Sequence, residues 1–259
     1  MNLEGSCNRS SVLNLFENNA EVHQLADHLS FSLTGQLHPL ALLAAKKLQQ
    51  YLQDHQDWEH NFGLSIGMEG VVIGKMFGVL VVRTMEGKLG YLFAFSGKLA
   101  GKNDHANFVP PIFDGLAEGG FLNEGMLALS RMSEDIRALE LAGLKMDDVK
   151  IKELKLSRKN YSATLQNKIF DQYHFINKIG ESKALRTVFE NTAAGRPSAG
   201  AGECAAPKLL QYAFENQLEP LALAEFWWGL SPKSANWKHG EFYQPCKDKC
   251  APILAHMLS

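Results

Sequence analysis

The sequence predicts a mixed fold of the α/β or α+β class, in which a β-hairpin and further strands are flanked by helices and interrupted by a long helical insertion. Three observations lead to this prediction. Residues 39–53 place apolar side chains at helical spacing, residues 76–95 contain two apolar runs separated by a turn, and residues 124–190 return to a helical pattern. Helices and strands that follow one another in this way are typical of a sheet covered by helices.

The first part of the predicted core, residues 38–123, contains a helix and a β-hairpin. A helix is expected over 39–53, where Leu and Ala recur at steps of three and four. Residues 76–82 are apolar almost without alternation and rich in valine, which is typical of a strand buried on both faces. A glycine-containing turn at 85–88 separates this run from a second one at 89–95, so we expect the two runs to pair as a hairpin.

Three other segments surround these elements. Residues 1–37 are expected to form a polar N-terminal leader. Residues 96–114 combine Gly, Asn, Asp and His with a Pro-Pro pair, and a loop of this length inside a domain is often functional. The sheet is expected to be truncated, or to be completed by residues 64–73 or by a further domain.

The insertion at 124–190 is expected to be helical and basic. Its second half places apolar side chains on one face of a long amphipathic helix, at Tyr161, Leu165, Ile169, Tyr173, Ile176 and Ile179. Between 149 and 186, nine basic and three acidic residues give a net charge of +6, whereas the rest of the chain carries −8. Such a basic arm is a candidate contact for an RNA backbone, through Lys150, Lys152, Lys155, Arg158, Lys159 and Lys168. A solvated helix face is the alternative interpretation.

Residues 191–202 consist largely of Gly, Ala, Pro and Ser and predict a linker without regular structure. The remaining residues, 203–259, are expected to return to the core. They begin with a helix whose start is marked by Pro207. A buried strand over 220–228 and a short last helix over 253–258 follow.

Three of the four cysteines lie in this last part, each at the expected start of a helix. Cys204 precedes one helix, Cys246 and Cys250 precede the last one, and Cys7 lies alone in the polar leader. Helix N-termini stabilise thiolates through their unpaired amide groups and their dipole. Three thiolates can hold one zinc ion with an open fourth position, as in catalytic zinc sites. His239 is a candidate fourth ligand, and three buried cysteines without a metal are the alternative.

The order of these features resembles the zinc-dependent cytidine deaminase fold. In that fold, a helix and a hairpin precede a helix that begins with His or Cys followed by Ala-Glu, and the next helix begins with Pro-Cys-x-x-Cys. Cys204 takes the first position in this chain, and Pro245 with Cys246 and Cys250 takes the second. The resemblance implies a zinc site built by three cysteines.

Two departures from the deaminase pattern affect the chemistry. Cys246 and Cys250 are separated by three residues instead of two, and Ala206 stands where the pattern has its proton-shuttling glutamate. Without that carboxylate, a water molecule has no general acid/base partner. Glu203 and Glu225 are the candidates to replace it.

Five long strings resemble the N-terminal region of bacterial RluA-like pseudouridine synthases. They cover most of the chain from about residue 38 onward: KMFGVLVVR (75–83), GYLFAFSGKLAGKNDHANFVPPIFD (90–114), GAGECAAPKLLQYA (200–213), LALAEFWWG (221–229) and PCKDKCAPILAHML (245–258). The resemblance implies a role in RNA modification, since in that family a catalytic domain that isomerises uridine in tRNA or ribosomal RNA follows this region. The family's Arg-Leu-Asp signature does not occur in these 259 residues, so no catalytic residue is carried over. The chain corresponds to the region before such a domain or to a stand-alone relative.

The composition limits the classes of protein that the chain can belong to. With 46% hydrophobic and 21% charged residues and a net charge of −2, it resembles a folded protein with a sizeable core. No apolar stretch approaches the roughly 20 residues that cross a bilayer. The first twenty residues also lack the apolar segment of a secretory signal. We therefore expect a cytoplasmic protein without a membrane span and without a disulfide framework.

Three hypotheses for the function follow. The first is a non-catalytic module, with a zinc ion or without one, that handles tRNA or rRNA for a pseudouridine synthase catalytic domain. The second is a zinc-dependent hydrolase of nucleobases or nucleotides with an unusual acid/base residue. The third is a protein interaction module whose helical arm packs against a partner.

Overall fold

A computed structural model describes residues 12–27, 29–33, 35–55, 58–65, 67–143, 148–233 and 235–259. They form seven helices, one antiparallel sheet and a separate two-stranded hairpin, so the predicted mixed fold is confirmed. Cys7 and the other residues of 1–11 lie outside the described residues. None of the helices described is long and apolar enough to cross a membrane.

The central sheet has five antiparallel strands. In spatial order they are β1 (Asn14–Leu15), β3 (Leu89–Phe95), β2 (Lys75–Arg83), β6 (Glu219–Trp228) and β7 (Phe242–Tyr243). The predicted hairpin is confirmed as β2 and β3, and the predicted strand at 220–228 is confirmed as β6. Because β2 lies between β3 and β6 and is covered on both faces, residues 77–82 are all buried, which explains the apolar pattern of this strand.

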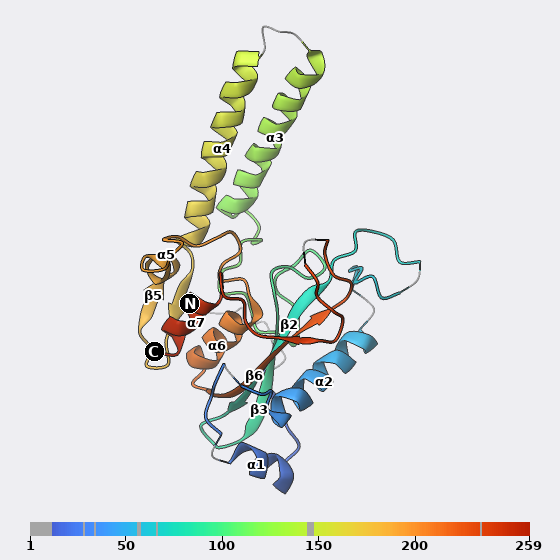
Figure 1. The fold of residues 1–259 in the computed structure, drawn as a ribbon, viewed down its shortest axis with the longest axis vertical. Helices are drawn as coiled ribbons and strands as arrows, with labels where there is room; N and C mark the ends of the chain where they lie inside the picture. The colour runs from blue at the N-terminus through green and yellow to red at the C-terminus, as the bar shows by residue number, and fades with distance from the viewer. Residues whose placement is uncertain are drawn as a thin grey trace, which may run out of the picture.

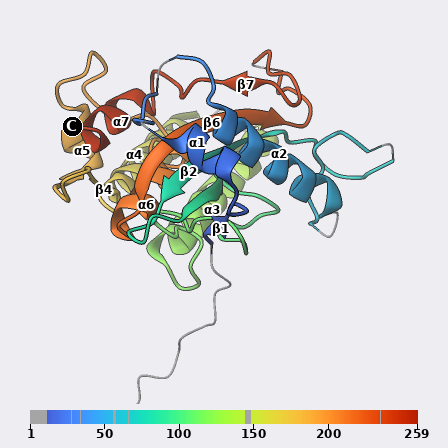
Figure 2. The same ribbon diagram turned by 90° about the horizontal axis from the view of Figure 1, so that it is seen from below.

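Helices cover both faces of the sheet (Figures 1 and 2). One face packs against α1 (Ala20–Ala26) and α2 (Pro39–Asp54), and α2 confirms the helix expected over 39–53. The other face packs against α6 (Ala205–Glu215), behind which lies α7 (Ala251–Met257). Successive residues of β2 point to opposite faces, so Phe77 belongs to the first core and Leu80 to the second.

α6 approaches β2 closely because Gly78 has no side chain. A Cβ atom at position 78 would lie 2.9 Å from the Cβ atom of Ala205 and 3.1 Å from Cδ1 of Leu209. Ala205 is the first residue of α6 and directly follows Cys204. Gly78 therefore sets the distance between the sheet and the helix start that carries Cys204.

Two long helices, α3 (Phe121–Ala142) and α4 (Asp148–Phe170), form an antiparallel arm that projects from the body (Figure 1). The segment 124–190 is thus largely helical, but the single amphipathic helix predicted to reach Ile179 is wrong. α4 ends at Phe170. Tyr173 and Ile179 lie beyond it, next to a hairpin of β4 (His174–Ile176) and β5 (Ser182–Ala184) that leads into α5 (Leu185–Phe189).

Turn chemistry and burial explain why the helix does not continue. The side-chain oxygen of Asn177 accepts the N–H groups of Ile179 and Glu181, and Gly180 adopts a φ of +85°, which closes a tight turn between β4 and β5. Phe175, in the centre of β4, is fully buried, and its carbonyl oxygen lies 2.9 Å from Nε2 of His256 in α7. Tertiary packing therefore overrides the helical spacing of the apolar residues here.

The segments outside the main helices and strands were predicted with mixed success. The described residues of 64–73 form no strand, so the expectation that they complete the sheet is wrong, and β1 and β7 take that role. Gly67 and Gly70 have φ values of +82° and +97°, which are incompatible with an extended strand. The segment 1–37 contributes β1 and α1, whereas 96–114 and 191–202 contain no helix or named strand.

The contact at Gly78 generates a stability prediction. Gly78→Ala should lower the free energy of unfolding by about 1–3 kcal/mol, because the added methyl group overlaps Ala205. Combining it with Ala205→Gly moves the methyl group from one side of the contact to the other. We expect the double variant to be at least about 1 kcal/mol more stable than the sum of the single variants predicts, measured by urea unfolding. Additive effects would show that this contact does not set the spacing.

Candidate metal centre

The structure brings the three predicted cysteine ligands together. The sulfur atoms of Cys204, Cys246 and Cys250 all lie within 4.8 Å of one another, and those of Cys246 and Cys250 are 3.3 Å apart. All three cysteines are free thiols. Four ligands at about 2.3 Å from a zinc ion would be spaced by roughly 3.8 Å, so modest adjustment of these sulfurs matches a tetrahedral site. Among the residues described, this is the one group of three or more side chains that could hold a metal ion.

Helix starts place the three thiols. Cys204 is the N-cap residue of α6, and Cys250 is the N-cap residue of α7. The carbonyl oxygen of Cys246 accepts the N–H groups of Cys250 and Ala251, at 3.2 and 3.1 Å, so residues 246–250 form a turn that leads into α7. This turn accommodates the additional residue between the two cysteines and still directs both thiols to one point.

The thiols share their protons unequally. Hydrogen bonds with Cys204 and Cys250 lower the pKa of Cys246 to about 2, and the hydrogen bond with Cys246 raises the pKa of Cys204 to about 12. The pKa of Cys250, which is only 1% exposed, is raised by the hydrogen bonds with both neighbouring thiols and by burial. One thiolate and two thiols form a soft donor set. A zinc ion that binds there would displace the protons of the two thiols, so that all three sulfur atoms become thiolate ligands.

The cluster opens into a pocket of about 360 Å³. The thiols form part of its wall together with Glu225, and two tryptophans and two lysines contribute other parts: Trp227, Trp237, Lys75 and Lys249. The rings of the tryptophans are nearly parallel, at an interplanar angle of 18° and a centroid distance of 5.8 Å. Its size and its aromatic and cationic lining suit a small planar ligand that carries negative charge.

Glu225 supplies a carboxylate beside the thiols. It is 4% exposed, and its Oε1 accepts the N–H of Ala206 at 3.0 Å. Ala206 is the position at which the deaminase pattern has its glutamate, so strand β6 brings a carboxylate to the place where helix α6 lacks one. Burial raises the pKa of Glu225 to about 7, and negative charge on Cys246 acts in the same direction, against the hydrogen bond from Ala206.

The strand register explains how Glu225 reaches this place. It pairs with Gly78 of β2, and a Cβ atom at position 78 would lie 3.5 Å from Cγ of Glu225. Glu225 points to the α6 face of the sheet, whereas its neighbours Ala224 and Phe226 belong to the core on the other face. The sequence left Glu203 and Glu225 as equal candidates, and an acid isolated within a buried apolar strand is the signal that could have singled out Glu225.

Glu203 and Lys208 lie next to the cluster with other partners. Glu203 lines the same pocket, but its Oε1 accepts the hydroxyl hydrogen of Tyr173 at 3.4 Å. Sequence reasoning missed Lys208, one helical turn after Cys204, which is buried and donates from Nζ to the carbonyl oxygen of Phe95 at 2.8 Å. Burial lowers the pKa of Lys208 to about 8, and the nearby charge of Glu203 acts against this shift.

The structure does not bring His239 into the cluster. Its Nδ1 accepts the N–H of Gly229 at 3.1 Å, and its ring lies against Trp228 with the centroids 4.3 Å apart. Both contacts fix the histidine at the end of β6. The expectation that His239 is the fourth ligand is therefore not supported, and the fourth position of a metal ion would face the pocket.

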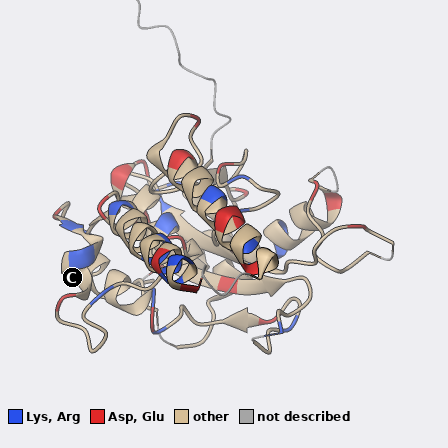
Figure 3. Ribbon diagram, turned by 90° about the horizontal axis from the view of Figure 1, so that it is seen from above, with Lys and Arg blue, Asp and Glu red and all other residues tan. Residues whose placement is uncertain are grey.

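The predicted basic arm is less basic once its partner helix is counted. α4 carries six basic and two acidic residues, but α3, against which it packs, carries four acidic and two basic residues. The arm as a whole therefore has a charge of +2. Lys155 forms an ion pair with Glu140 at 2.7 Å, and Nε of Arg158 donates to the hydroxyl of Ser133 at 2.7 Å. Figure 3 shows acidic and basic residues interspersed along these helices.

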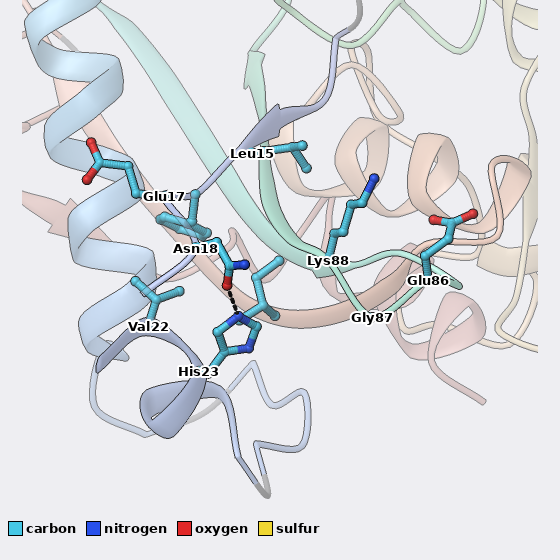
Figure 4. A pocket seen from close by; sticks show the side chains of 10 residues that line it. Leu15, Glu17, Asn18, Val22, His23, Glu86, Gly87 and Lys88 are labelled. Atoms are coloured by element: carbon cyan, nitrogen blue, oxygen red, sulfur yellow. Dashed lines mark hydrogen bonds between the residues drawn. The ribbon is translucent and has the colours of Figure 1, made fainter. Parts of the chain in front are cut away.

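A second pocket of about 360 Å³ lies between β1, α1 and the turn that joins β2 to β3 (Figure 4). Nε2 of His23 is 2.8 Å from Oδ1 of Asn18, but Glu86 and Lys88 lie apart from this pair and do not converge with it on one point. The pocket brings together no set of metal ligands or nucleophile with a base, so we assign it no chemistry.

No protein-family model, curated protein or solved structure matches the chain. Three thiols can hold a metal ion, a buried carboxylate beside them can accept and return a proton, and an aromatic pocket can hold a planar ring. This combination points to hydrolytic chemistry.

Removal of individual ligands tests the metal centre. Cys246→Ser and Cys250→Ser should each lower the zinc content from about one per chain to near zero, because two protein ligands hold zinc far more weakly than three. The melting temperature should fall with it, by about 2–4 °C for each kcal/mol of stability lost. Elemental analysis and calorimetry on protein purified without a histidine tag measure both quantities.

Cys204→His is the matched control, since imidazole also ligates zinc and should retain the metal. A wild-type protein without zinc, whose serine variants lose stability but no metal, would identify the cysteines as packed core residues.

Proposed function

We propose that the chain is a zinc-dependent hydrolase with a cytidine deaminase-like centre, which removes an amino group from a nucleobase. The observation that carries this proposal is the position of Glu225. Its carboxylate accepts a hydrogen bond from the backbone N–H of Ala206, which lies in the first turn of α6 close to Cys204. Glu225 also lines the pocket that the three thiols line. The acid/base group that the sequence motif lacks is thus supplied by a neighbouring strand.

The order of elements supports a deaminase-like core. Helix α2 and the β2–β3 hairpin precede α6, which begins after Cys204, and β6 then leads to α7, which begins after Cys250. Both cysteine-bearing helix starts lie at the same end of the sheet, since their thiols meet in one cluster. The resemblance to the deaminase fold implies this order of elements, apart from the origin of the glutamate and the additional residue between Cys246 and Cys250.

The residues of the site divide the chemistry among them. Cys204, Cys246 and Cys250 would hold the zinc ion, which supplies Lewis acidity that makes a water molecule nucleophilic near neutral pH. Glu225 would accept a proton from a water molecule in the pocket as the water oxygen adds to the ring carbon that bears the amino group, and would pass that proton to the ring nitrogen whose double bond to this carbon opens. The same carboxylate would then take the remaining hydroxyl proton and give it to the amino nitrogen, so that the carbon–nitrogen bond breaks, ammonia leaves and a carbonyl group remains.

The surroundings of Glu225 suit this role. The N–H of Ala206 fixes one carboxylate oxygen, so the group keeps its orientation while it exchanges protons. Its pKa of about 7 allows it to bind and release a proton near neutral pH. Trp237, which stacks on the buried Trp227, provides a flat apolar surface in the wall of the pocket for the ring of the substrate.

A second candidate function is a non-catalytic module that handles RNA for a pseudouridine synthase catalytic domain, with a structural zinc ion. The observation that favours it is the excess of lysine on α4, where Lys150, Lys152, Lys159 and Lys168 are exposed. The resemblance to the N-terminal region of RluA-like enzymes leads in the same direction. In such a module the thiols would hold zinc for stability alone, and Glu225 would have no substrate to act on.

A conservative change at Glu225 tests the first proposal. Glu225→Gln preserves the acceptor for the amide of Ala206 but cannot carry the proton, so ammonia release should fall by about 10²–10⁴-fold. The assay follows ammonia release by the zinc-loaded full chain from cytidine, adenosine, their monophosphates and a short single-stranded RNA. Zinc content and melting temperature should stay close to those of the wild type.

Glu203→Gln is the control. The carboxylate of Glu203 accepts a hydrogen bond from the hydroxyl of Tyr173, so this substitution should leave the rate of ammonia release nearly unchanged. Equal losses in both variants would contradict the assignment of the acid/base role to Glu225. Absence of ammonia from every substrate with fully zinc-loaded wild type would favour the non-catalytic module.

A further inference from the structure

A second, larger groove at the base of the arm adjoins the metal pocket. This groove, of about 650 Å³, is lined by one face of α4, by Arg186 and by residues 194–199 of the loop before α6. Ala199 belongs to the wall of the groove, and the next residue, Gly200, belongs to the wall of the metal pocket. Lys249 donates from the pocket side to the carbonyl oxygen of Ala199 at 2.8 Å. One short loop thus separates the two hollows.

The face of α4 that lines the groove continues along the arm. Ala163, Gln166 and Phe170 line the groove, and at 100° per residue Lys159 and Lys152 fall within the same 60° sector of the helix. Both lysines are exposed. The distance along the helix axis from Phe170 to Lys152 is about 27 Å, from a rise of about 1.5 Å per residue. The face that continues the groove therefore carries two lysines.

The other basic residues of α4 lie elsewhere. Lys155 and Arg158 contact Glu140 and Ser133 of α3, so they serve the contact between the two helices. Lys150 and Lys168 lie about 160° around the helix from Phe170, on a face away from the groove. The six lysine and arginine residues of α4 thus divide into three pairs, of which one follows the groove.

The charges and rings along this path fit one kind of ligand. Lys75 and Lys249 line the pocket, and Arg196 lines the groove. Arg186 also lines the groove but forms an ion pair with Asp171. Glu203 in the pocket and Glu190 in the groove add negative charge. A ligand that stacks an aromatic ring against the tryptophan in the pocket wall and places spaced negative charges beside exposed cations is a nucleic acid strand. A base can enter a pocket of this kind only when it is unpaired or turned out of a duplex.

We propose that the substrate is a single-stranded polynucleotide, whose reacting base occupies the metal pocket while its backbone crosses the loop at Ala199 and follows the face of α4 with Lys159 and Lys152. This inference rests on the proposed function, since it assigns the substrate class of the same site. It gives the arm a role in binding that a free nucleoside would not require.

Matched double variants of the zinc-loaded full chain test the path. Lys152→Gln with Lys159→Gln removes the two lysines that follow the groove, and Lys150→Gln with Lys168→Gln removes the same charge from the opposite face. Glutamine and lysine have similar helix propensities, so α4 should stay folded. Binding is measured by fluorescence anisotropy with a labelled 15-nucleotide single-stranded RNA of mixed sequence, and with the same RNA in a duplex, between 0.05 and 0.3 M salt.

We expect the groove-face variant to bind the single strand roughly tenfold more weakly at 0.1 M salt. The slope of log K against log salt concentration should decrease in magnitude by about 1.4, because each phosphate contact with a single strand contributes about 0.7. The opposite-face variant should stay within about twofold of the wild type, and the duplex should bind more weakly than the single strand. Equal effects of the two variants, or no effect of either, would overturn the path, as would equal binding of a labelled poly-glutamate peptide.

Ammonia release separates this inference from the proposed function. A free nucleoside does not reach α4, so both double variants should release ammonia from it at the wild-type rate. If the protein releases ammonia from a nucleoside but neither double variant changes RNA binding, the proposed function is preserved and the path is rejected. Groove-dependent binding of the single strand without ammonia release from any substrate would reject the proposed function and leave a strand-binding surface.

Discussion

The close packing of α6 against β2 at Gly78 is the constraint on which the site depends. Because position 78 has no Cβ atom, Ala205 at the start of α6 can approach the sheet, and the side chain of Glu225, which pairs with Gly78 across the sheet, has room on the same face. A single glycine thus allows the start of α6, which carries a thiol, and strand β6, which carries a carboxylate, to meet at one point. A larger residue would separate Cys204 from Glu225 before it affected the rest of the core.

This meeting point concentrates groups that are costly to bury alone. Glu225, Lys208 and the thiol of Cys250 are all buried, and each has a partner: the amide of Ala206, the carbonyl oxygen of Phe95 and the neighbouring thiols. Burial raises the pKa of the carboxyl group and lowers that of the amine, so both groups titrate closer to neutral pH than they do in water. Such perturbed groups in a pocket are more typical of a functional site than of a core that only stabilises the fold.

The sequence predicted the elements better than their contacts. The helix at 39–53, the hairpin at 76–95 and the strand at 220–228 follow from patterns that local burial produces, and the cysteines could be placed at helix starts because Pro and polar residues mark those starts. The end of α4 was not predicted, since the apolar spacing beyond Phe170 fits a helix, whereas the packing of Phe175 in a hairpin and the turn at Asn177 and Gly180 reject it. Glu225 could be a candidate from sequence, but its position beside Ala206 depends on the strand register, which no local pattern specifies.

The arm illustrates the same limit for electrostatics. A charge count along the sequence treats the basic segment as isolated, whereas in the fold α3 offsets much of its charge and the contacts with Glu140 and Ser133 engage two of the six cations. What matters for a ligand is then which cations share a face with the groove. Two lysines on one face carry less charge than the whole segment suggests, but they lie on the helix face that lines a groove next to the metal pocket. Alignment of modest charge with a path, more than total charge, connects this arm to the chemistry of the site.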